Sequence, residues 1–164
     1  MIEINLNREV ALDMMDFNVV CDFNALVFAE EHIIIHAERD KIMAVLSEIN
    51  NWHNWRNGIS EIKLLASHIQ EGAKFEWKSG GLKYKSEIHT ASAACFGWTG
   101  NTIGAHAIHN WYIKKLPNGS SEVVVQESLS GWSILLLRKM MRRELPILLK
   151  KDLQELKFAC ENKL

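Results

Sequence analysis

The chain has 164 residues, of which 48% are hydrophobic and 24% charged, and its 19 basic and 20 acidic side chains give a charge of −1 at pH 7. A chain of this length fits one domain that buries about two-thirds of its unfolded surface. The balanced charge gives no positive field to attract a nucleic acid, so nucleic-acid binding is disfavoured.

The cysteines and the first residues bear on the compartment. Cys21, Cys95 and Cys160 are odd in number and widely spaced, so they indicate neither a disulfide framework nor a zinc site. We expect them to be reduced core residues. The first residues lack the basic start of a secretory signal. The sequence also contains no run of about 18 apolar residues, which is the length that a membrane-spanning helix needs. We therefore expect a cytoplasmic protein.

Residues 1–27 show no clear pattern, so we interpret them as an N-terminal extension of a domain that covers residues 28–164. Residues 30–37 have the β-branched density of a strand. Asp40 then stands at the N-cap position of a helix with one apolar face, and Trp52 belongs to a second, short helix. One strand followed by two short helices is the prediction for this part.

After Gly58 the hydrophobic period changes from 3.6 residues to two. Six strand-length runs follow, separated by short turns that contain glycine, serine or proline. Such short connections favour an antiparallel meander. The runs are 59–66, 73–81, 82–91, 94–102, 105–116 and 121–129.

Residues 131–162 predict one long helix. Its apolar side chains recur at three- and four-residue steps and therefore form one stripe, which resumes in phase beyond Pro146, so we expect a bend there and not a break. The stripe needs an apolar surface, which a sheet with one apolar face supplies by curling around the helix. The stripe consists of Ile134, Leu137, Met141, Leu145, Leu148, Leu149, Leu153, Leu156 and Cys160.

This order of elements, carried by residues 33–60, 72–81, 96–111 and the Glu127, Ser128 and Gly131 pattern before the long helix, resembles the SRPBCC superfamily of START-like lipid carriers and polyketide cyclases. The resemblance implies an α+β helix-grip fold, in which a curled antiparallel sheet of about seven strands wraps the C-terminal helix. It also implies an apolar pocket between sheet and helix. It does not imply which ligand fills the pocket.

One hairpin can be aligned from its own residues. The tripeptide Pro117-Asn118-Gly119 suits a three-residue loop with glycine in the left-handed position. Closing this loop brings apolar residues opposite apolar residues, whereas a slip of one residue would mix the two faces. The expected pairs are Leu116 with Ser120, Ile113 with Val123, Trp111 with Val125, and His109 with Glu127.

The hairpin places His109 and Glu127 on the inward, apolar face, where each must be paired because desolvation is costly. The pair could be structural, fixing the strand register. It could instead anchor the polar part of a ligand or perform acid–base chemistry on a polyketone, since a histidine changes its charge near neutral pH. Tyr84, Ser86 and Thr99 are further candidate polar groups.

The expected function is binding of a hydrophobic small molecule, such as a lipid or a polyketide-like metabolite, without a cofactor or a metal. The alternatives are a cyclase or aromatase with His109 and Glu127 as catalytic candidates, and a protein-binding module of the chaperone-partner type. Aromatic members of the candidate site could equally be plain core. The candidate ligand-binding residues are Trp55, Phe75, Trp77, Tyr84, Ser86, Trp98, His109, Trp111, Glu127, Trp132, Met141 and Leu145.

Overall fold

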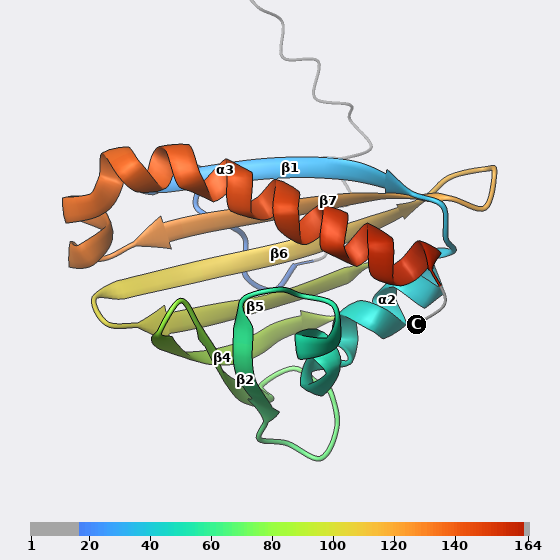
Figure 1. Cartoon of the computed structure of the whole chain (residues 1–164), viewed down its shortest axis with the longest axis horizontal. Coiled ribbons are helices and arrows are strands. Elements are labelled where there is room, and N and C mark those ends of the chain that lie inside the picture. The colour runs from blue at the N-terminus through green and yellow to red at the C-terminus, as the bar shows by residue number, and fades with distance from the viewer. Residues whose placement is uncertain (1–16, 163–164) are drawn as a thin grey trace, which may run out of the picture.

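A computed structural model describes residues 17–162 of the chain. One curved antiparallel sheet has the strand order β1-β7-β6-β5-β4-β3-β2, and the long helix α3 lies across its inner face (Figure 1). The predicted α+β class and the meander are therefore confirmed. The elements are β1 (Val27–Ile35), α2 (Arg39–Ser47), the 3-10 helix η2 (Ile49–Asn54), β2 (Ile59–Leu64), β3 (Lys74–Ser79), β4 (Leu82–Ala91), β5 (Cys95–Thr102), β6 (Ala105–Lys115), β7 (Ser121–Ser130) and α3 (Trp132–Glu161).

The turn between β6 and β7 has the predicted form. Gly119 has a φ angle of +76°, a conformation that glycine adopts without a steric penalty. The backbone N–H of Leu116 donates to the carbonyl of Ser120 over 2.9 Å, which closes the loop. The strands then pair as expected, with Trp111 opposite Val125 and Ile113 opposite Val123.

Helix α3 runs without interruption through Pro146 and packs mainly against β1 and β7. Most side chains of the predicted stripe are buried between α3 and the sheet, but Leu137 and Leu148 are exposed. At 100° per residue, Leu137 and Leu148 lie about 110° and 90° from the centre of the buried members, so they point past the sheet. The buried members are Ile134, Leu145, Leu149, Leu153, Leu156 and Cys160.

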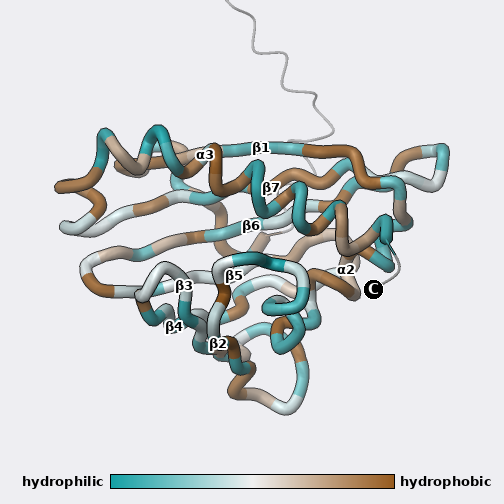
Figure 2. The backbone as a smooth tube through the Cα atoms, viewed as in Figure 1, coloured by the Kyte–Doolittle hydropathy of each residue, from teal (hydrophilic) through white to brown (hydrophobic). Residues whose placement is uncertain are grey.

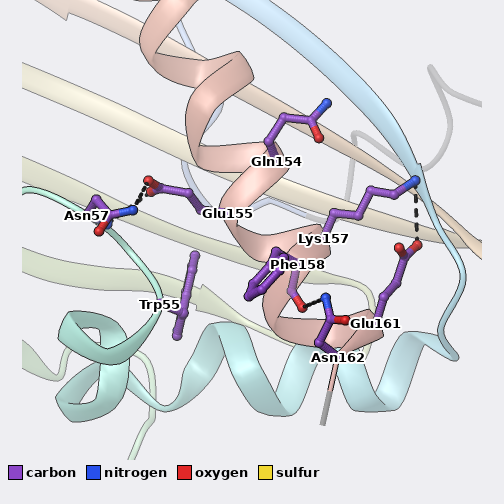
Figure 3. A pocket seen from close by; sticks show the side chains of 8 residues that line it. All are labelled: Trp55, Asn57, Gln154, Glu155, Lys157, Phe158, Glu161 and Asn162. Carbon is purple, nitrogen blue, oxygen red and sulfur yellow. Dashed lines mark hydrogen bonds and ion pairs between the residues drawn. The ribbon is translucent and has the colours of Figure 1, made fainter. Parts of the chain in front are cut away.

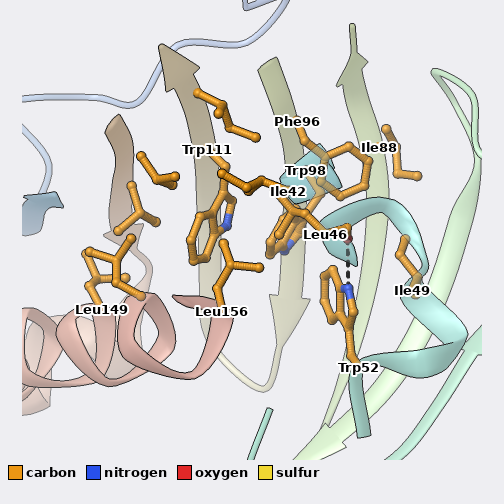
Figure 4. Close-up of a cluster of buried hydrophobic side chains, with 14 of the residues drawn as sticks. Ile42, Leu46, Ile49, Trp52, Ile88, Phe96, Trp98, Trp111, Leu149 and Leu156 are labelled. Carbon is orange, nitrogen blue, oxygen red and sulfur yellow. Dashed lines mark hydrogen bonds between the residues drawn. The ribbon is translucent and has the colours of Figure 1, made fainter. Parts of the chain in front are cut away.

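Aromatic side chains fill the interior between η2 and the sheet (Figure 4). Trp52 is fully buried, and its indole N–H donates to the carbonyl of Leu46 over 2.8 Å. Its ring lies 5.1 Å from that of Trp98 and 5.7 Å from that of Phe75, in tilted and edge-on arrangements that aromatic pairs prefer. This end of the interior is therefore packed with protein and not open to a ligand.

A buried ion pair joins the loop after η2 to α3. The guanidinium of Arg56 contacts the carboxylate of Asp152, and both side chains are almost inaccessible to solvent. Arg56 also lies over the rings of Trp52 and Trp77, at 5.2 and 5.5 Å from their centroids. The pair therefore fixes the distance between the helix and the edge of the sheet.

Removing one partner of this pair should be strongly destabilising. We expect Asp152→Ala to lower the free energy of unfolding by about 3–5 kcal/mol, because it leaves the charge of Arg56 buried without compensation. The double variant Arg56→Met with Asp152→Leu should recover most of that loss. Urea denaturation of the three proteins measures both effects, and equal stability of Asp152→Ala and the unaltered protein would show that the pair is not structural.

Residues 17–26 cross the outer face of the sheet. The N–H of Asn18 donates to Thr90, the side chain of Asn110 donates to the carbonyl of Val19, and the N–H of Asp22 donates to Ser128. The described part of the predicted 1–27 extension thus ties β4, β6 and β7 together, and β1 begins one residue before the expected boundary. Residues 1–16 of that extension, and residues 163–164, lie outside the described residues.

The three cysteines are free and buried, as expected. Burial raises the pKa of the Cys21 thiol to about 12 and that of Cys160 to about 11, so both stay protonated at neutral pH. Within residues 17–162, no helix combines the length and the apolar composition that a membrane crossing needs.

His89 lies beside this N-terminal segment and makes stability depend on pH. Burial lowers its pKa from 6.5 to about 4. Between these values the unfolded chain takes up a proton that the folded chain does not, so stability is lost as the pH falls from 6.5 towards 4. We expect His89→Gln to lose less stability over this range, measured by urea denaturation at each pH. Identical pH profiles of the two proteins would contradict this assignment.

Candidate functional site

His109 and Glu127 face each other across β6 and β7, as predicted. His109 Nδ1 lies 2.9 Å from Glu127 Oε2. Because a carboxylate only accepts, this geometry assigns the proton of the neutral ring to Nδ1, which donates to Oε2. The His109 side chain is 5% exposed and the Glu127 side chain 17%, so solvent reaches Glu127 more than it reaches the imidazole.

Two indole rings confine the imidazole. Trp98 stacks on His109 at 4.4 Å with an interplanar angle of 13°, and Trp111 lies 5.6 Å away on the same strand. His109 Nε2 is enclosed by packed side chains and has no hydrogen-bond partner within residues 17–162. The ring can therefore orient Glu127, but it does not face a space that a second molecule could enter.

Glu127 borders a part of the inner face that solvent reaches. We call this part the open inner face; it consists of half-buried residues from five elements. Burial raises the pKa of the Tyr84 phenol, and the charge of Glu127 raises it further, so the hydroxyl stays protonated and available as a donor. The open inner face is formed by Trp77, Tyr84, Ala107, Glu127 and Met141.

Stacked rings form one wall of the open inner face. The Trp77 and Tyr84 rings lie 4.4 Å apart at an interplanar angle of 19°. The indole N–H of Trp77 donates to Ser86 Oγ over 3.1 Å, so Ser86 fixes the orientation of the Trp77 ring. Gly100 faces Ser86 across the strand pair and adds no side chain to this surface.

The other predicted site residues lie elsewhere. Phe75, Trp98, Trp111 and Leu145 are buried in the core. Trp55 instead lines a surface hollow of about 430 Å³ beside Phe158, near the end of α3 (Figure 3). Trp132 is exposed, with its ring over Gly104. Thr99 pairs with Ile108 one residue away from Trp98, so it faces the opposite, outer side.

Arg56, in the loop after η2, contacts the Trp77 ring of the open inner face, and no sequence pattern directly indicated it. An indirect signal was Asp152, which stands within the apolar stripe of α3, three residues after Leu149 and four before Leu156. A carboxylate on a buried helix face requires a cation. The partner of that carboxylate, 96 residues away, is set by the fold alone.

No known family profile matches the sequence, and no curated protein is similar to it by sequence. Solved structures are similar over most of the chain. The hypothetical protein jhp0584 from Helicobacter pylori has a TM-score of 0.74 at 18% identity, covering 84% of this chain and 90% of its own. A START superfamily protein from Mycobacterium smegmatis has a TM-score of 0.72 at 12% identity, covering 82% and 97%. This chain has the helix-grip fold of START-like proteins.

The helix-grip fold also includes the Zhui aromatase/cyclase from Streptomyces sp. R1128, which has a TM-score of 0.69 at 12% identity and covers 82% of this chain and 93% of its own. The predicted resemblance to START-like proteins is therefore confirmed. At identities this low, the structural similarity establishes the fold alone. The ligand has to be inferred from the residues of the site.

Proposed function

We propose that this protein binds a hydrophobic small molecule, of the lipid or polyketide-like class, against the open inner face. The observation that carries the proposal is the position of Glu127. A carboxylate on an apolar face lowers the stability of the fold, so its presence there indicates a functional role such as binding a ligand. His109 holds one of its oxygens, and the surrounding surface is aromatic and partly accessible.

The remaining polar groups suit a hydroxyl or enol on the ligand. Glu127 Oε1 and the Tyr84 hydroxyl have no hydrogen bond within the described part of the chain, and both residues belong to the open inner face. The carboxylate would accept from a ligand hydroxyl, and the phenol would donate to it. Hydrogen bonds to an ionised group are the stronger kind, so this anchor orients a molecule held mainly by apolar contact.

The aromatic wall supplies the apolar contact. Trp77 and Tyr84 present stacked rings, while Ala107 and Gly100 leave room beside them. Packing of Trp52, Phe75 and Trp98 limits how far a ligand reaches towards η2. Similar structures described as aromatase/cyclases add support for a polyketide-like ligand.

The same geometry favours binding over catalysis by the histidine. A cyclase mechanism with His109 as general base needs the imidazole to reach the substrate. Nε2 of His109 is enclosed by packed side chains, and Nδ1 is hydrogen-bonded to Glu127. We therefore assign His109 the role of positioning Glu127.

The test begins with native mass spectrometry of the full chain, to find a co-purifying molecule, followed by thermal melts with fatty acids, sterols and aromatic polyketides. The compound that raises the melting temperature most is then titrated. We expect Glu127→Gln to weaken its binding about ten- to a hundredfold, since a charge-assisted hydrogen bond contributes about 1.5–3 kcal/mol. The unliganded variant should melt close to the unaltered protein, because the amide oxygen still accepts from His109.

The matched control is Glu122→Gln, the same substitution on the outer face of the same strand. It should leave binding unchanged, and Tyr84→Phe should weaken it. If Glu127→Gln binds as tightly as the control, the polar anchor is wrong. If no compound co-purifies and none changes the melting temperature, the binding function itself is refuted.

A further inference from the structure

Apolar side chains project from one end of the molecule, where α3 begins. Leu136 is 75% exposed, Ile103 76% and Trp132 62%, and Leu135 and Met140 are exposed as well. Figure 2 shows hydrophobic positions at this end of the backbone. We call these five residues the apolar tip. Isolated exposed leucines are ordinary, but a contiguous group of this kind marks an interaction surface.

The apolar tip is held in place by packing. The N–H of Ser133 donates to the carbonyl of Gly104 over 3.1 Å, which ties the start of α3 to the turn between β5 and β6. The Trp132 ring covers Gly104 so closely that a side chain at that position would collide with it. Ile103 and the first turns of α3 therefore form one rigid surface.

Cations lie directly beside the apolar tip. Trp132, Leu136 and Met140 follow each other at four-residue steps and form one exposed line along the helix. At 100° per residue, Lys139 and Arg143 lie next to this line, and Arg142 and Arg138 lie farther around the helix. Residues 132–143 contain no carboxylate, although the whole chain has a charge of −1. The four cations are Arg138, Lys139, Arg142 and Arg143.

The first turns of α3 also border a hollow of about 630 Å³. Its lining mixes Leu135, Leu136, Leu137 and Met140 with Arg138, Lys139 and Arg142. Arg143 pairs with Glu144, and the Nε of Arg142 donates to the carbonyl of Leu26, so these two arginines are partly engaged within the protein. Arg138 and Lys139 have no ion-pair partner within residues 17–162. Such a lining suits acyl chains next to anionic head groups.

We propose that the apolar tip docks on an anionic lipid surface, with its apolar side chains in the head-group region and the four cations against the phosphates. A helix segment that exposes a tryptophan and an apolar line, carries several cations and contains no carboxylate has the composition of an interfacial membrane helix. A second copy of the chain fits less well, because a two-fold contact would bring the same cations of both copies together. This inference is independent of the ligand at Glu127.

The test is co-sedimentation of the full chain with vesicles of phosphatidylcholine alone or mixed with phosphatidylglycerol. We expect binding to the mixed vesicles only, weakened by salt, with a blue shift of tryptophan emission. Leu136→Glu, and the double variant Arg138→Glu with Lys139→Glu, should each reduce binding about tenfold or more. Both changes are at exposed positions, so the melting temperature should stay unchanged.

Matched controls come from other exposed positions. Phe158→Glu at the far end of α3 and Lys41→Glu on α2 should bind the mixed vesicles like the unaltered protein. The proposal is overturned if the protein ignores both kinds of vesicle, or if the controls lose binding as much as the tip variants do. It is also overturned if sedimentation shows a dimer that Leu136→Glu dissociates, because the second copy then covers the tip.

Discussion

The register of the β6–β7 hairpin determines what lies inside this protein. Gly119 closes a loop that pairs Leu116 with Ser120, and the two-residue alternation then sends His109 and Glu127 to the inner face together. The neighbouring strands continue this row, with Trp98 opposite His109 and Ala29 opposite Glu127. A slip by one residue would turn Glu127 and the apolar residues of β7 outward while His109 stayed inside, so the site and the core depend on the same turn.

The interior has two unlike halves. Near η2, the side chains of Trp52, Phe75 and Trp98 fill the space beside the sheet. The Arg56–Asp152 ion pair ties α3 to the loop after η2. Farther along the strands, α3 covers mainly β1 and β7 and leaves the open inner face accessible. Glu127 lies at the boundary between the two halves. Its hydrogen-bond partner His109 lies in the packed half, and Glu127 itself borders the open half. The packed half supplies rigidity, and the open half supplies the surface for a ligand.

Sequence reasoning predicted what local patterns determine. The period-two runs, the turn chemistry at Asn118-Gly119 and the stripe of α3 each depend on residues close together in the chain, and they gave the sheet, the hairpin register and the His109–Glu127 pair. Whether tryptophans fill a cavity or line it depends on side-chain volumes in three dimensions, so Trp98 and Trp111 could not be separated from Trp77 in advance. The pairing of Arg56 with Asp152 joins distant segments and was invisible for the same reason.

The central claim is that a ligand occupies the open inner face beside Glu127, and the indole N–H resonances of the six tryptophans report on it. In an NMR titration with the compound that stabilises the protein most, the signal of Trp77 should shift. Those of Trp52, bonded to Leu46, and Trp55, beside Phe158, should stay in place. A shift of Trp55 alone, with Trp77 unmoved, would place the ligand in the surface hollow at the end of α3 and contradict the claim.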